Sequence, residues 1–203
     1  MSAPLPTPAA PALPTEITII LDRSGSMQSI LNDAIGGFNA FLAAQRRQPD
    51  CETTRLSLVL FDDQYEVPHK SLPLAQVPDL TPLTFVPRGG TALLDAIGRT
   101  VAKMTRSFAA RPAESKPRKV IIAILTDGEE NSSREYSQLH ISDLITAKRD
   151  LGWEFIFLAA GQDAIATATT LSIPAADAYT FAQNLAEEAF VIMSDRVSEK
   201  RLK

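Results

Sequence analysis

Hydrophobic residues occur along this chain in two patterns, short continuous runs and stripes that repeat every three or four positions. A continuous apolar run of about four to eight residues is typical of a buried strand, whereas the three-and-four spacing is typical of an amphipathic helix. The runs predict strands at 16–21, 55–61, 65–69, 120–125, 153–159 and 178–181. The stripes predict helices at about 30–42, 93–108, 134–150, 163–171 and 185–197, and residues 71–90 read as a loop.

The order of these elements indicates a three-layer, doubly wound α/β fold with a mostly parallel sheet. The 120–125 run is apolar throughout, as expected for a parallel strand that is covered on both faces. Pro68 suits an edge strand, because proline has no N–H to donate to a neighbouring strand. Gly36 and Gly37 lie inside a predicted helix, where glycine is unfavourable, and therefore indicate close packing against another element.

Residues 1–15 differ in composition from the rest of the chain. They are almost entirely Ala, Pro, Ser, Thr and Leu, and five of them are proline. Proline at this density opposes both helix and sheet, so we expect a disordered, Pro/Ala-rich arm, with a docking peptide for a proline-binding partner as the alternative. The folded domain is expected at 16–203.

Composition narrows the class of protein. The chain has 203 residues, 45% of them hydrophobic, and a net charge of −4, which argues against bulk binding to nucleic acid or to an anionic membrane. Cys51 is the only cysteine, so no intrachain disulfide can form, which suits a reducing compartment. No apolar run approaches the roughly 18 residues of a membrane span, and the N-terminus lacks the pattern of a secretory signal. A cytoplasmic location is therefore expected.

Small oxygen-bearing side chains gather where predicted strands end. Asp22, Ser24 and Ser26 follow the first strand, Asp127 follows the 120–125 strand, and Thr91 precedes a helix after two glycines. In open α/β sheets, binding sites form beyond the carboxyl ends of the strands, so these segments should meet at one edge.

Each of these five residues has an ordinary alternative role. Asp, Ser and Thr are favoured helix caps and turn residues, and taken singly each could be one of these. Taken together they supply two carboxylates and three hydroxyls, which is the ligand chemistry of a hard divalent cation. Because the set contains no His or Cys, zinc is disfavoured.

The same segments carry a resemblance to a known family. DRSGSM at 22–27 matches the D-x-S-x-S signature of von Willebrand factor type A (vWA) domains, and GGT at 89–91 and LTDGEEN at 125–131 match their second and third metal segments. The chain resembles a stand-alone bacterial or phage vWA domain from about residue 16 to residue 181. The resemblance implies a six-stranded sheet, with the 57–61 strand beside the first and the 65–69 strand antiparallel at the edge. It also implies a metal-ion-dependent adhesion site formed by Asp22, Ser24, Ser26, Thr91 and Asp127.

Two functions follow from these residues. The first is a non-enzymatic module that grips an Asp or Glu carboxylate of a protein partner through a divalent metal. We expect the metal to be Mg²⁺, with Mn²⁺ or Ca²⁺ as alternatives. The second is a Mg²⁺-dependent phosphohydrolase that uses Asp22 together with an Arg88-Gly89-Gly90 phosphate cradle. The absence of a G-x-x-x-x-G-K-[ST] loop and of a well-placed Lys or His base argues against the enzyme.

Other polar residues are weaker candidates. His69 and His140 are expected at the surface, Asp163 as a helix cap, and Asp62-Asp63 as turn residues. Residues 129–131 (Glu-Glu-Asn) are expected to be a solvated loop, with orientation of the metal ligands as the alternative.

Overall fold

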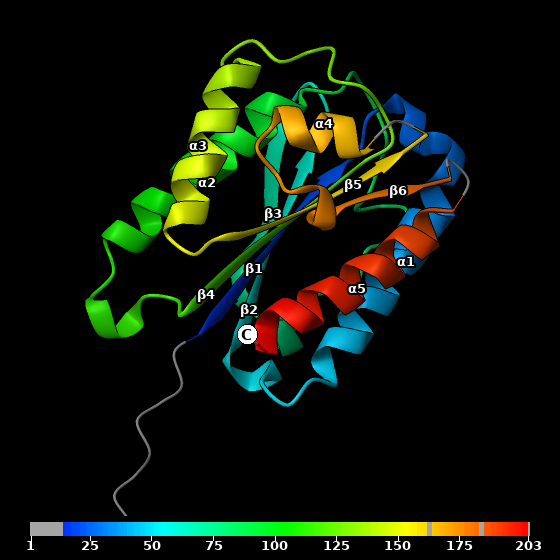
Figure 1. Ribbon diagram of the computed structural model, residues 1–203. Coiled ribbons are helices and arrows are strands. Elements are labelled where there is room, and N and C mark those ends of the chain that lie inside the picture. Colours follow the sequence, from blue (N-terminus) through cyan, green and yellow to red (C-terminus); the bar gives the residue numbers. More distant parts are fainter. Residues whose placement is uncertain (1–13, 162–163, 183–184, 203) are drawn as a thin grey trace, which may run out of the picture.

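The computed structural model describes residues 14–161, 164–182 and 185–202, and its centre is a six-stranded sheet with helices on both faces (Figure 1). The strands are β1 (Thr15–Asp22), β2 (Thr54–Phe61), β3 (Tyr65–Pro73), β4 (Lys119–Thr126), β5 (Glu154–Ala160) and β6 (Ala178–Phe181). They lie in the order β3-β2-β1-β4-β5-β6. Every neighbouring pair is parallel except β2 and β3, so the predicted α/β fold with an antiparallel edge strand is confirmed.

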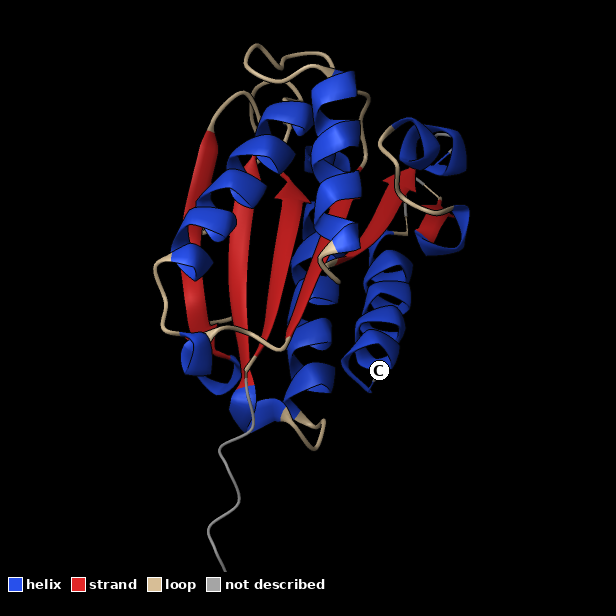
Figure 2. Cartoon of the chain, turned by 60° about the vertical axis from the view of Figure 1, so that its left-hand side comes forward, coloured by secondary structure: helices blue, strands red, loops and turns tan. Residues whose placement is uncertain are grey.

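The helices form the two outer layers, which lie on opposite sides of the sheet in Figure 1, whereas Figure 2 shows the sheet more nearly face-on. On one face lie α1 (Leu31–Arg46) and α5 (Ala186–Leu202), and on the other lie α2 (Leu93–Ala109), α3 (Gln138–Asp150) and α4 (Ala164–Thr170). Each layer encloses its own apolar core, because alternate residues of a strand point to opposite faces. In β1, for example, Ile19 belongs to the core beneath α1 and α5, whereas Ile20 belongs to the core beneath α2 and α3.

The structure corrects several predicted boundaries. The predicted helix at about 30–42 is α1, which begins at Leu31, and a 3₁₀ helix at Gly25–Ile30 precedes it. Residues 71–73 continue β3 rather than beginning the loop. The predicted helix at 134–150 begins only at Gln138, because the N–H groups of Arg134, Glu135 and Tyr136 donate to the carboxylate of Asp95 and Ser137 caps the helix.

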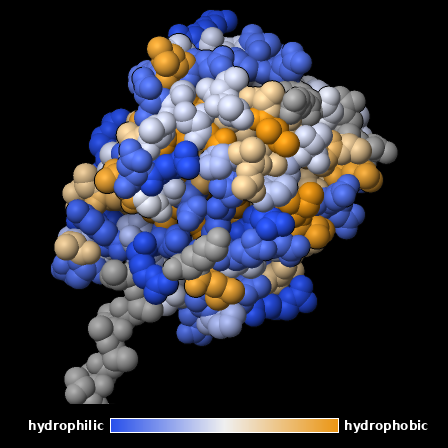
Figure 3. Space-filling model, in the orientation of Figure 1, coloured by the Kyte–Doolittle hydropathy of each residue, from blue (hydrophilic) through white to orange (hydrophobic). Residues whose placement is uncertain are grey.

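The predicted arm ends earlier than expected. Thr15 is already the first residue of β1, and the carbonyl of Pro14 accepts a hydrogen bond from the N–H of Arg118. The rest of the predicted arm, residues 1–13, lies outside the described residues. Within the described residues no helix is long and apolar enough to cross a membrane. The face shown in Figure 3 is mostly hydrophilic, with apolar side chains in small separate patches, which is normal for a protein surface.

At Gly37, α1 is in close contact with α5. A Cβ atom at Gly37 would lie 2.5 Å from Cδ2 of Phe190, whereas one at Gly36 would have no neighbour within 4 Å. The Phe190 ring also packs edge-on against Phe38, with ring centroids 6.2 Å apart. The predicted close packing is therefore confirmed, and it rests on Gly37 alone.

This difference between adjacent glycines can be tested by stability. Gly37→Ala should lower the free energy of unfolding by about 1–3 kcal/mol, because the added methyl group overpacks the contact with Phe190. Gly36→Ala should be neutral or should raise it by up to about 1 kcal/mol, because alanine favours helix. Urea denaturation of the two variants and the parent measures both values. Equal effects of the two substitutions would contradict the proposed packing.

Candidate metal centre

The site begins at the ends of β1 and β4, which are adjacent parallel strands. Asp22, the last residue of β1, is fully buried. Its Oδ1 atom accepts a hydrogen bond of 2.7 Å from the N–H of Ser24, and its Oδ2 atom accepts one of 2.6 Å from the hydroxyl of Thr126, the last residue of β4. Both carboxylate oxygens are therefore held by hydrogen bonds, one from the backbone of the loop after β1 and one from a side chain at the end of β4.

Three hydroxyl groups converge next to this carboxylate. The Oγ atoms of Ser24 and Ser26 are 3.0 Å apart, and Ser26 donates a hydrogen bond of 2.7 Å to Oδ1 of Asp127. A Cβ atom on Gly128 would lie 3.1 Å from Oγ1 of Thr91, 3.6 Å from Oγ of Ser26 and 4.0 Å from Oγ of Ser24. The fold thus brings together all five residues that the sequence singles out.

Burial disfavours the charged forms of the Asp22 and Asp127 carboxylates. Burial raises the pKa of Asp22 to about 6, against the hydrogen bonds from Thr126 and Ser24, which lower it. Burial also raises the pKa of Asp127, and the bond from Ser26 opposes this shift. Neither carboxylate pairs with a Lys, Arg or His side chain within the described part of the chain. A cation bound between them would favour their ionised forms.

These residues fit a hard divalent cation. Among the described residues no three His, Cys, Asp or Glu side chains are grouped to hold a metal, so the ligands beyond the two Asp must be hydroxyls or water. The space beside Gly128, which has no side chain of its own, is faced by hydroxyl oxygens of three different residues. Oxygen donors with one or two carboxylates are what Mg²⁺ uses. Ser26 is exposed and Asp127 half-buried, so the site can be reached from solvent.

The loop after β4 fixes the position of Thr91. The Oδ1 atom of Asn131 accepts a hydrogen bond of 2.9 Å from the N–H of Thr91, and the carboxylate of Glu130 accepts one of 2.9 Å from Leu94 at the start of α2. Glu130 also accepts from the N–H groups of Ser132 and Ser133. The expectation of a simple solvated loop is therefore wrong for Glu130 and Asn131, which orient the Thr91 segment. Glu129 is exposed, as expected.

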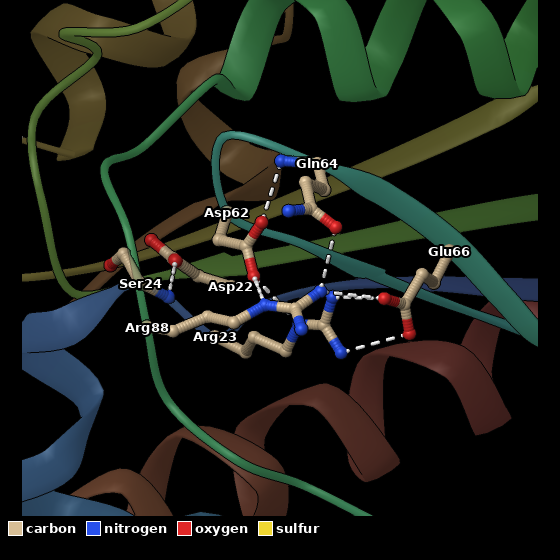
Figure 4. A network of polar contacts seen from close by, with 7 residues as sticks. All are labelled: Asp22, Arg23, Ser24, Asp62, Gln64, Glu66 and Arg88. Atoms are coloured by element: carbon tan, nitrogen blue, oxygen red, sulfur yellow. Dashed lines mark hydrogen bonds and ion pairs between the residues drawn. The ribbon is translucent and has the colours of Figure 1, made fainter.

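A network of two arginines and two carboxylates joins the first loop to the segment before Thr91 (Figure 4). The buried carboxylate of Asp62 accepts from Nε of Arg23 at 2.9 Å and from Nε of Arg88 at 2.8 Å. Glu66 of β3 accepts from the other ends of both guanidinium groups, at 3.0 Å from Arg23 and 2.6 Å from Arg88. The bonds to Arg23 and Arg88 lower the pKa of Glu66 to about 2. The network therefore fixes both arginines in place.

This network changes two expectations. Arg88 is occupied by Asp62, Gln64 and Glu66, so the structure does not support the Arg88-Gly89-Gly90 phosphate cradle of the enzyme hypothesis. Asp62 does act as a turn residue, since it accepts from the N–H of Gln64, but it also binds both arginines.

The family can now be stated. A model of the von Willebrand factor type A domain matches residues 16–192. The chain belongs to this family. No curated protein matches it.

Solved structures share the vWA fold at low sequence identity. The pilus adhesin SpaC from Lactobacillus rhamnosus GG, in its open conformation, is 12% identical with a TM-score of 0.67, and the match covers 93% of this chain and 30% of the adhesin. This chain therefore spans less than a third of the adhesin's length. The vWF domain of the type V pili tip protein Mfa5 from Porphyromonas gingivalis is 12% identical, has a TM-score of 0.66, and the match covers 92% of this chain and 95% of that one.

A third vWA structure bears on metal binding. Proximal thread matrix protein 1 from the mussel byssus, in a form whose metal-ion-dependent adhesion site holds zinc, is 14% identical with a TM-score of 0.62. That match covers 92% of this chain and 46% of the mussel protein. At these identities the similarity establishes the fold alone.

The roles of three residues around this vWA site were not predicted by the sequence. Thr126 reads only as the end of an apolar run, and the role of Asp62 depends on two arginines that are far apart in the chain. Asp95 was taken as part of a helix, yet its buried carboxylate accepts from three backbone N–H groups of the loop before α3. The remaining candidates lie elsewhere: His69 is on β3, His140 is on α3 beside Tyr136, and Asp163 is outside the described residues.

Asp62 should be important for the stability of this vWA domain. Asp62→Ala would leave the buried guanidinium of Arg23 without its fully buried partner, so the free energy of unfolding should fall by about 3–5 kcal/mol. Asp63→Ala, which removes an exposed carboxylate from the next position, is the matched control and should change it by at most about 0.5 kcal/mol. Chemical denaturation measures both, and a small effect of Asp62→Ala would show that the ion pairs add little.

Proposed function

We propose that this vWA domain is a non-enzymatic binding module that grips a carboxylate of a protein partner through a divalent cation. Asp22, Ser24, Ser26, Thr91 and Asp127 would hold the cation, directly or through water. Mg²⁺ is the preferred ion from the all-oxygen donor set, with Mn²⁺ or Ca²⁺ as alternatives. When bound, the cation supplies a positively charged seat for an Asp or Glu side chain of the partner.

The observation that carries this proposal is the convergence of three hydroxyls beside two carboxylates that have no cationic partner among the described residues. Hydroxyl ligands are neutral, so at most two negative charges from the protein offset the charge of a divalent ion. A cation held in this way can still attract one more anionic oxygen. A storage site would instead surround the ion with more carboxylates.

The comparisons favour the same reading in general terms. Members with this fold include a pilus adhesin and a pilus tip protein, and the mussel protein holds zinc at its adhesion site. The enzyme alternative is weakened because the guanidinium group of Arg88 is occupied by Asp62 and Glu66. Without that group, Asp22 has no phosphate-binding neighbour from the predicted cradle.

Metal binding can be tested by calorimetry. The parent should bind Mg²⁺, and the Asp22→Ala, Asp127→Ala double variant should lose at least about 10–100-fold in affinity, the range seen when groups that support a metal site are removed. Gly128→Ala keeps all five ligand residues but places a methyl group 3.1 Å from the Thr91 hydroxyl, and should also weaken binding. Unchanged Mg²⁺ affinity in both variants would disprove the assigned site.

The adhesion function can be tested by capture of a partner from the native host. Parent protein should capture it in Mg²⁺ and release it in excess EDTA. Thr91→Ala should reduce capture strongly but change stability little, because the Thr91 hydroxyl does not cap α2, whose N-cap residue is Ala92. Thr146→Ala, which removes an exposed hydroxyl on α3, is the control and should capture normally. Capture that persists in EDTA and in Thr91→Ala would mean that another surface binds the partner.

A further inference from the structure

A second hollow lies on the far side of α2 from α3, away from the metal centre. It has a volume of about 740 Å³ and is bounded by α2 and by the face of β1, β2 and β3. Among the described helices, α2 packs on β1 and β2 of this face and α4 packs on β5 and β6, whereas none packs extensively on β3, so the space between α2 and β3 stays open. Its size falls within the range of about 300–1,000 Å³ that is typical of small-molecule sites.

The inner surface of this hollow is largely apolar. Val59 of β2 and Tyr65 and Val67 of β3 form the floor, and Met104 and Phe108 of α2 form the wall. Val59 is buried, while the other four are only partly buried and pack at the margin of the core beneath α2. An apolar ligand placed here would remove additional hydrophobic surface from water.

The mouth of the hollow is positively charged. Lys70 of β3 and Lys103 and Arg106 of α2 line it, and none of the three forms an ion pair in the described part of the chain. Burial lowers the pKa of Lys103, and the neighbouring charges of Arg99, Lys70 and Arg106 lower it further. The Nζ atom of Lys103 lies 4.1 Å from the centroid of the Tyr65 ring, which belongs to the floor, in a chain whose net charge is −4.

Among the described residues that line the hollow, Glu16 is the one acidic group. Glu16 is 2% exposed, and its carboxylate is already paired with Arg111 at 2.8 Å and accepts a hydrogen bond of 2.7 Å from Ser71. It therefore provides no counter-ion for Lys70, Lys103 or Arg106. The hollow combines an apolar interior with cationic side chains that have no anionic partner among the described residues.

We propose that this hollow binds a free, unbranched long-chain carboxylate, with the acyl chain on the apolar floor and the carboxylate between Lys70 and Lys103. The anionic head would relieve the repulsion among the mouth cations, and the chain would cover Val59, Val67 and Met104. Arg106, one turn further along α2, would reinforce the attraction. This site is independent of the metal centre, which lies at the opposite end of β1.

A peptide fits the hollow less well than an acyl chain. A strand added to the edge of β3 would meet Pro68 and Pro73, which have no N–H to donate. A peptide lying across the apolar floor would leave backbone polar groups without partners. An unbranched acyl chain has no such groups, so only its head needs a polar contact.

Trp153 offers a reporter for binding. It is the only tryptophan of the chain, and its ring lies 5.7 Å from that of Phe108, which lines the hollow. Titration of the parent with carboxylates of 8, 10 and 12 carbons, below their micellar concentrations, should change its fluorescence. Affinity should rise by about fourfold for each added methylene, the effect of burying that group. The alcohol of 12 carbons should bind at least about tenfold more weakly than the carboxylate.

Variants distinguish the contribution of the charged head group of the ligand from that of its acyl chain. The Lys103→Gln, Arg106→Gln double variant should lose about tenfold in affinity for the carboxylate and keep its affinity for the alcohol. The Arg47→Gln, Arg134→Gln variant removes the same two charges from exposed positions outside the hollow, and should bind as the parent does. Val67→Trp fills the floor and should weaken both ligands. Calorimetry on the same set checks the fluorescence.

Several results would overturn the proposal. Affinity that does not depend on chain length, or that is equal in the two double variants, would show that the hollow is not the binding site. Tighter binding of an acidic peptide than of the 12-carbon carboxylate would assign it to a peptide. Carboxylate binding that appears only after deletion of residues 1–13 would make that segment its occupant. Mg²⁺ binding should be unaffected in every variant. A failure of this proposal therefore leaves the metal-site proposal untouched, and the reverse also holds.

Discussion

A hydrogen bond between Thr126 and the buried carboxylate of Asp22 joins the ends of the two central strands, β1 and β4. The parallel register of these strands places the two residues side by side, and the loops that follow them must then leave the sheet from almost the same point. Ser24 and Ser26 on one loop and Asp127 on the other therefore face each other. The geometry of the site follows from the pairing of two strands whose apolar side chains fill the cores on both faces of the sheet.

The third segment, which carries Thr91, is held by reciprocal hydrogen bonds, in which α2 and the loop after β4 each provide a carboxylate that accepts from the backbone of the other. Glu130 of the loop accepts from the first turn of α2, and Asp95 of α2 accepts from the loop four to six residues further on. Each carboxylate satisfies N–H groups that would otherwise lack partners at the start of a helix or in a turn. The two segments are therefore joined by hydrogen bonds in both directions, which positions Thr91 relative to the loop that carries Asp127.

The sequence was sufficient for the parts of this arrangement that depend on pattern. Apolar runs locate all six strands to within a few residues, and the D-x-S-x-S, Gly-Gly-Thr and Thr-Asp-Gly segments indicate all five candidate ligands. The long-range contacts of Asp62, Thr126 and Asp95 were not predicted, because these partners are 26 or more residues away in the chain. Periodicity describes how a segment meets the core, but it carries no information on which distant backbone group a single carboxylate will accept from. The start of α3 was misplaced for the same reason.

The contact between Gly37 and Phe190 limits how the last helix can sit on the first. A helix that packs through side chains alone can often shift along its neighbour, because one apolar residue replaces another beneath it. Here the Phe190 ring occupies the space that a side chain at Gly37 would need. A slide of one turn, about 5.4 Å, would place the ring against Asp33 or Phe41, each of which has a side chain. A slide of α5 by one turn along α1 in either direction is therefore opposed by a side chain where Gly37 leaves open space.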